Sequence, residues 1–243
     1  MFRQRVSRGV PFHVFSELEA IAGLVHAFST RHSDAPHEDA ERPARVAGEK
    51  SSLWKALGIE APAGVRCIHS ARIVEAAECH PGKRADGILT APGQVAAVRT
   101  ADCLGVIIVD PRRRRCAVLH AGWRGTLGRI AARGAERLRQ ATGSHPSGFT
   151  AALGPSIRAC CYEVGGEVRE AFAGQGHPVE RIFTGRRLDL VECNRLQLRQ
   201  AGVGTILDSR QCTSCRPDLY YSWRRNRDAS RLVTVAGFLE GGG

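Results

Sequence analysis

The chain has 243 residues, enough to bury a substantial core, and we expect a single domain over residues 1–243. Its hydrophobic content of 43% and charged content of 24% are those of an ordered globular protein, which excludes a disordered chain. The net charge of +11 would suit nucleic acid, but aromatic residues make up only 6%, and only three of the 35 basic residues are lysines. We therefore favour anionic small molecules over nucleic acid as partners.

The first third of the chain predicts short strands and one helix. An apolar run over 23–29 predicts an early strand, and a polar, proline-bearing loop is expected over 32–48. Apolar residues at helical spacing predict a helix over 49–57. The short β-type segments that follow are 65–69, 72–76, 87–90 and 94–99.

The middle of the chain contains the clearest pattern. Residues 104–109 show no polar alternation, which predicts a central strand covered on both faces. Its expected partner is 116–120, and the four arginines over 112–115 are expected to lie in a solvated turn between the two strands. Helical spacing then predicts a helix over 126–141.

The second half continues to alternate between strands and helices. The predicted helices are 165–172 and 188–200, and the predicted strands are 149–153, 203–207, 219–223 and 231–238. This alternation predicts an α/β or α+β layered domain with mixed β-sheets flanked by helices.

The N-terminal residues lack the apolar core of a signal peptide, and no segment approaches the length needed to span a membrane. We therefore expect a cytoplasmic protein without a membrane partner. The nine cysteines should then be mostly reduced thiols.

The strongest candidate site combines His69, Cys103 and His120. Cys103 comes just before the central strand and His120 ends its partner, so both are expected at connected strand ends, where functional residues often lie. Two imidazoles and a thiolate can bind zinc and leave one position open for water or substrate. The same residue types can instead form a cysteine nucleophile with its base, as in a metal-free hydrolase or amidase that uses Cys103 with a histidine base.

Arg124 lies beside this set, between Gly122 and Gly125, and before the predicted helix start at Thr126. Free amides at a helix start and a guanidinium fork both suit phosphate, although a structural arginine stacked on its tryptophan neighbour is an alternative. Asp102 is a candidate to orient a ligand or handle a proton, or else is a structural turn carboxylate.

Two other cysteine motifs carry weaker signals. Cys212 and Cys215 have redox or zinc-knuckle spacing, but no second pair follows nearby, so we expect them to be reduced and not metal-bound. The vicinal Cys160 and Cys161 are expected to be structural. The sequence contains no phosphate-binding P-loop, dinucleotide-binding glycine motif or G-x-S-x-G elbow.

The motifs together resemble the laccase-like polyphenol oxidase domain family, whose members are regarded as purine nucleoside phosphorylases with adenosine deaminase and methylthioadenosine phosphorylase activities. The matching strings span nearly the whole chain: 28–31, 85–87, 100–103, 120–125, 153–157 with 161–164, 212–213 and 222–225. The resemblance implies a layered α/β fold like that of cysteine hydrolases, and zinc at His69, Cys103 and His120. This chain departs from the family after Arg31, where glycines are usual, and at Glu49-Lys50, where an asparagine-arginine pair is usual.

The implied function is phosphorolysis of adenosine, inosine or methylthioadenosine, with deamination of adenosine. Phosphate would be held by Arg124 and Arg31, because a guanidinium matches phosphate oxygens in a bidentate fork. Zinc would activate the water that deamination needs. Copper is disfavoured as the metal, because the nine histidines include no His-x-His pair and the only methionine is Met1.

Overall fold

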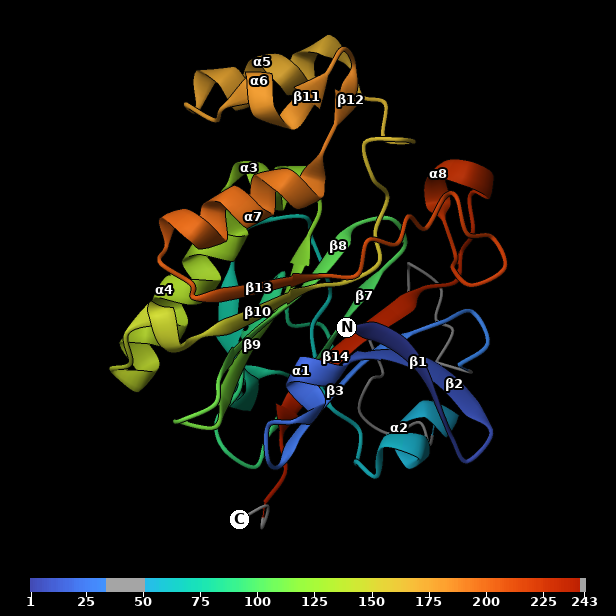
Figure 1. The fold of residues 1–243 in the computed structure, drawn as a ribbon, viewed down its shortest axis with the longest axis vertical. Helices are drawn as coiled ribbons and strands as arrows, with labels where there is room; N and C mark the ends of the chain where they lie inside the picture. The colour runs from blue at the N-terminus through green and yellow to red at the C-terminus, as the bar shows by residue number, and fades with distance from the viewer. Residues whose placement is uncertain (34–50, 241–243) are drawn as a thin grey trace.

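The computed structural model of the chain describes residues 1–33 and 51–240. The predicted loop over 32–48 lies outside this range from residue 34 onward, as do Glu49 and Lys50. Two six-stranded mixed sheets form the centre of the molecule, and helices lie outside them (Figure 1). The prediction of a layered mixed α/β fold is confirmed.

The first sheet is antiparallel except where its edge strand β4 pairs with β7. Its strands, in spatial order, are β1 (Phe2–Ser7), β2 (Val10–Phe15), β3 (Leu24–Ser29), β14 (Leu232–Phe238), β7 (Val95–Thr100) and β4 (Ala63–Gly64). The second sheet is antiparallel at its centre and parallel at both edges. Its strands are β13 (Thr205–Asp208), β10 (Thr150–Leu153), β8 (Leu104–Asp110), β9 (Arg115–Ala121), β6 (Gly87–Leu89) and β5 (Ile73–Glu75).

The two sheets pack face to face around one apolar core, and β8 shows why its sequence lacks polar alternation. Ile107 and Val109 point into the core between the sheets. Val106 and Ile108 point to the other side, where α4 (Ile130–Thr142) and α7 (Leu190–Gln200) cover the second sheet. Both faces of the strand are therefore buried, as predicted.

The remaining helices lie around the sheets. The helix α2 (Ser52–Leu57) packs on the outer face of the first sheet. A small lobe with its own apolar cluster, at the top of Figure 1, contains α5 (Gly166–Gly174), α6 (Val179–Ile182), β11 (Phe183–Thr184) and β12 (Arg187–Leu188). The short helices are α1 (Ser16–Glu19), α3 (Trp123–Leu127), α8 (Trp223–Asn226), η1 (Ala76–Glu78) and η2 (Pro146–Gly148).

Three predicted elements were wrong. The segment 65–69 is a loop with a single bridge from Arg66 to Arg84, because a buried carboxylate takes the N–H groups that a strand would need. The helix predicted over 126–141 is two helices, since Arg129 between them has φ of 60°, which ends a right-handed helix. Residues 219–223 form a turn leading into α8, whose start is capped by the Ser222 side chain. The N-terminal hairpin of β1 and β2 was not predicted.

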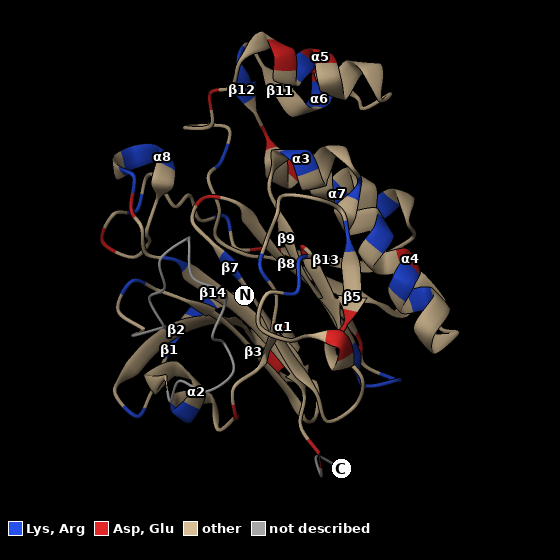
Figure 2. Ribbon diagram, turned by 180° about the vertical axis from the view of Figure 1, so that it is seen from behind, with Lys and Arg blue, Asp and Glu red and all other residues tan. Residues whose placement is uncertain are grey.

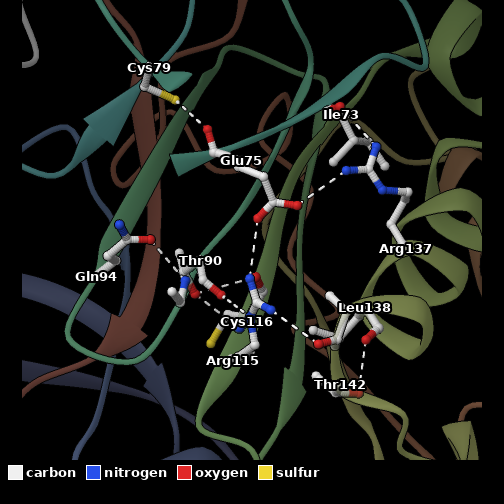
Figure 3. Close-up of polar contacts among 12 residues, drawn as sticks. Ile73, Glu75, Cys79, Thr90, Gln94, Arg115, Cys116, Arg137, Leu138 and Thr142 are labelled. Carbon is white, nitrogen blue, oxygen red and sulfur yellow. Dashed lines mark hydrogen bonds and ion pairs between the residues drawn. The ribbon is translucent and has the colours of Figure 1, made fainter. Parts of the chain in front are cut away.

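The arginine run at the β8–β9 turn is only partly solvated, which corrects a further expectation. Arg112 and Arg113 are exposed, but Arg114 lies over the Phe238 ring at 5.2 Å. Arg115 extends along the sheet edge, where its guanidinium reaches the Thr90 carbonyl (2.9 Å), the Ala141 carbonyl and the carboxylate of Glu75 (Figure 3). Arg137 of α4 bonds to the same carboxylate, so that this cluster joins helix to sheet.

Candidate functional site

The three predicted ligands converge. The ligand atoms of His69, Cys103 and His120 all lie within 4.8 Å of one another. Strands β8 and β9 explain two of them, because their register pairs Leu104 with Ala121 and so brings the Cys103 turn beside the end of β9. His69 lies in the loop before β5.

Gly122 keeps the space between these side chains open. A Cβ atom at this position would lie 2.9 Å from Cys103 Sγ, 3.1 Å from His69 Cδ2 and 3.8 Å from His120 Cε1. The backbone of Gly122 has an ordinary φ of −76°, so space and not conformation requires the glycine. The donor set and the open space both fit a metal ion held by one sulfur and two nitrogens.

Asp86 supports two of the three cluster residues, although no functional role was predicted for it. It is fully buried, and its Oδ1 accepts the N–H groups of Ile68 (3.1 Å) and His69 (2.8 Å). Its Oδ2 accepts the N–H and the hydroxyl of Ser70, both at 2.7 Å. Nδ1 of His120 donates to Oδ1 at 2.8 Å, which leaves Nε2 of that ring for the cluster. Its sequence signals were its place in the family-matching string 85–87 and its position directly before a predicted strand.

The electrostatics of the cluster favour a thiolate. Burial raises the pKa of Cys103, but His120 and His69 beside it outweigh burial and lower that pKa to about 6. Burial also opposes protonation of His120, yet the neighbouring Cys67, Cys103 and Asp86 raise its pKa well above the usual value. At neutral pH, Cys103 is therefore available as a ligand or as a nucleophile.

The backbone is strained at two positions of the site. His69 has φ of 58° and Asp102 has φ of 87°, in a region that costs a residue with a side chain about 1–3 kcal/mol. Asp102 is buried, and its two oxygens accept the Thr213 hydroxyl (2.6 Å) and the Arg224 N–H (2.7 Å). The carboxylate therefore fastens the loop of Thr213 and the first turn of α8 to the site.

A pocket with a volume of about 580 Å³ opens over the cluster, a size typical of small-molecule sites. Its aromatic lining comes from Trp123, Tyr162 and Trp223. Its arginines are Arg66, Arg99, Arg124, Arg224 and Arg231, and the basic helix α8 at its edge is blue in Figure 2. Most of these residues were not predicted as pocket residues, because they come from strands, short helices and loops far apart in sequence.

Arg124 reaches the pocket as predicted, but the local structure differs. Its helix, α3, begins at Trp123 and has only five residues, so the predicted start at Thr126 was wrong and little helix dipole is available. The Arg124 guanidinium lies 4.2 Å over the Trp123 ring. Within the described residues, the side chains of Arg124 and Arg66 make no hydrogen bond or ion pair, so the N–H donors of two guanidinium groups are unused beside the cluster.

Arg31, the second predicted phosphate-binding residue, does not line this pocket. Its guanidinium donates to the Pro217 carbonyl and lies 5.3 Å over the Tyr221 ring. Its N–H bonds to the Leu219 carbonyl, so its contacts are with the loop that precedes α8.

A known family shares this combination of fold and sequence. The family described as multi-copper polyphenol oxidoreductase laccase matches residues 26–238. The chain belongs to this family. A purine nucleoside phosphorylase of Deinococcus radiodurans is 37% identical over 228 residues, covering 87% of this chain and 88% of the relative. Adenosine deaminase RL5, from an unknown prokaryotic organism, is 42% identical over 142 residues, covering 55% and 53%.

The solved structure of the Bacillus licheniformis hypothetical protein YfiH has the same fold, with a TM-score of 0.80 at 27% identity and 98% of each chain covered. The resemblance found in the motifs is therefore confirmed at the level of family. In the described part of the chain, no helix combines the length and apolar character needed to cross a bilayer.

Proposed function

We propose that this chain is a zinc-dependent purine nucleoside phosphorylase that cleaves adenosine, inosine and methylthioadenosine with phosphate, and that also deaminates adenosine. The observation that carries the proposal is one pocket with a His/Cys/His cluster at its base and two unpaired arginines beside it. The names of two relatives, a purine nucleoside phosphorylase and an adenosine deaminase, support both activities.

In this proposal, His69, Cys103 and His120 hold the metal. Zinc bound there supplies Lewis-acid chemistry and leaves a coordination position free for a reactant. Arg124 and Arg66 bind phosphate, because unpaired guanidinium groups can each form two parallel hydrogen bonds to its oxygens. Trp223 is 44% exposed at the pocket, and a purine can stack on its ring by replacing one of the guanidinium groups of Arg227 and Arg231, which lie over the ring at 5.4 and 5.8 Å.

The choice of zinc over copper rests on the ligands. Multicopper oxidation needs further histidine clusters, since one His/Cys/His set provides a single site. In residues 1–33 and 51–240, the other potential ligand groups are four cysteines and a set that shares His120 with the cluster. Neither supplies the histidines of a second copper centre.

The test is Arg124→Lys, which keeps the charge and loses the fork. In phosphate-dependent cleavage of inosine, we expect the KM for phosphate to rise by about 10- to 100-fold, because one or two charge-assisted hydrogen bonds to phosphate are lost. Adenosine deamination should change much less, because that reaction has no phosphate to hold. The matched control is Arg133→Lys, an exposed arginine on α4. Equal loss of both activities, or cleavage without phosphate dependence in the wild type, would refute the proposal.

A second candidate is favoured by one feature of the geometry. Cys103 contacts His120, and His120 donates to Asp86, which is the order of a thiol, base and orienting carboxylate in cysteine hydrolases. That function needs no metal. Zinc bound in a one-to-one ratio at this cluster supports the phosphorylase, whereas a metal-free protein inactivated by iodoacetamide at Cys103 supports the hydrolase.

A further inference from the structure

Four cysteines meet at a second place in the fold. The sulfur atoms of Cys160, Cys161, Cys212 and Cys215 all lie within 4.8 Å of one another, and all four are free thiols. Cys215 Sγ is 3.6 Å from Cys160 Sγ and 3.4 Å from Cys161 Sγ. The sequence suggested no metal here because Cys212 and Cys215 lack a second pair nearby. The structure supplies that pair from a loop some fifty residues earlier.

We propose that these four cysteines bind a second zinc ion. A disulfide has a sulfur–sulfur distance of about 2.0 Å, much shorter than the distances here. A tetrahedral zinc–thiolate site has bonds of about 2.3 Å, which place its sulfur atoms about 3.8 Å apart. Small movements of the side chains therefore convert the observed cluster into four-sulfur coordination.

The backbone around the cluster is built to hold the sulfur atoms. A parallel bridge joins Ser156 to Cys212, and the Thr213 N–H donates to the Ser156 carbonyl at 3.0 Å. The Arg216 N–H donates to the Cys212 carbonyl at 3.2 Å, which closes the turn that carries Cys212 and Cys215. These backbone contacts hold the two cysteine-bearing loops against each other and so keep the four sulfur atoms together.

The site is closed, which indicates a structural role. Four cysteine ligands fill a tetrahedral zinc and leave no position for a substrate, unlike the three-ligand cluster at His69, Cys103 and His120. The zinc would join the loop of Cys160 and Cys161 to the loop of Cys212 and Cys215, and both loops reach the pocket. Tyr162 lines it directly, and Thr213 bonds to Asp102 in its wall. The second zinc would therefore hold one side of the pocket in place.

The experiment measures the metal content of the purified 243-residue chain by mass spectrometry. We expect about two zinc ions in the wild type and about one in the double variant Cys160→Ser/Cys215→Ser. Both cysteines are exposed, so the substitution removes little packing. The matched control, Cys79→Ser, changes a half-buried thiol that belongs to neither cluster and should retain both ions.

This inference does not depend on the proposed function, and the two can fail separately. The double variant His69→Ala/His120→Ala should also lose one zinc, and it should keep the ion of the four cysteines. The inference is overturned if Cys160→Ser/Cys215→Ser binds as much zinc as the wild type, or if the cluster holds iron or a disulfide. If that variant does not fold, the wild type decides: a chelator should expose the four thiols to iodoacetamide, and thiols that react equally without chelator would exclude bound metal.

Discussion

Asp86→Asn is the sharpest single test of how the three-ligand cluster is built. The change keeps the size of the side chain and removes its charge. Whichever way the amide turns, its NH2 group replaces one oxygen. This NH2 group then faces either the N–H donors of Ile68, His69 and His120 or the N–H and hydroxyl donors of Ser70. A fully buried group that loses acceptors in this way leaves polar hydrogens without partners.

The size of the effect follows from these bonds. Loss of at least the two hydrogen bonds from Ser70, each worth about 1.5–3 kcal/mol, predicts destabilisation by about 3–6 kcal/mol. For a chain of this length, that corresponds to a fall in Tm of about 6–24 °C. Zinc affinity should also fall by about 10- to 100-fold, because the His120 ring loses its orienting carboxylate.

Asp110→Asn is the matched control. Asp110 is also buried, but its Oδ1 alone accepts hydrogen bonds, from Arg112 and Arg113, and its Oδ2 has no partner within the described residues. An amide can place its NH2 group at the unpartnered position, so this variant should lose far less stability. Urea unfolding and competition with a zinc chelator measure both variants. Equal stability of the two, with zinc affinity unchanged in Asp86→Asn, would refute the role given to Asp86.

Two further predictions concern stability. The Phe15 N–H donates to Nε2 of buried His26 at 3.0 Å, which needs an unprotonated ring, and burial lowers the pKa of His26 to about 4. Because the unfolded chain binds more protons between about pH 6.5 and 4, His26 contributes up to about 3 kcal/mol of stability that is lost as pH falls through that range. In urea unfolding, His26→Gln should reduce this pH dependence without abolishing it, because burial also lowers the pKa of His13 to about 4. Arg115→Ala should lower the free energy of unfolding by about 1–3 kcal/mol through its bonds along the sheet edge, whereas the exposed Arg113→Ala should change it by less than about 0.5 kcal/mol. Equal effects of the two arginine variants would contradict the role of Arg115.

The sequence was sufficient for the centre of the fold and for placing Cys103 beside His120. Strands β8 and β9 were recognisable because both are continuously apolar, and the short connection between them makes them neighbours. Once the two strands are paired, Cys103 and His120 must lie at the same end of the hairpin. Their proximity is thus a consequence of local pattern and topology.

Contacts between distant loops could not be predicted in this way. Arg66, Tyr162 and Trp223 reach one pocket from three separate segments, and no periodicity relates them. Cys160 and Cys215 likewise come from separate loops, so their proximity could not be predicted either. The run of four arginines predicted a solvated turn, but the Arg115 guanidinium forms hydrogen bonds along the sheet edge. A run of charges in the sequence does not reveal such contacts.

Two buried carboxylates explain how these loops form a fixed site before any ligand binds. Asp86 holds the loop of His69, and Asp102 holds the loops of Thr213 and Arg224. The strained φ angles of His69 and Asp102 each cost about 1–3 kcal/mol. Hydrogen bonds to charged acceptors contribute about 1.5–3 kcal/mol each, so the several bonds at each carboxylate offset that strain. The positions of the cluster side chains are therefore held by the protein's own hydrogen bonds.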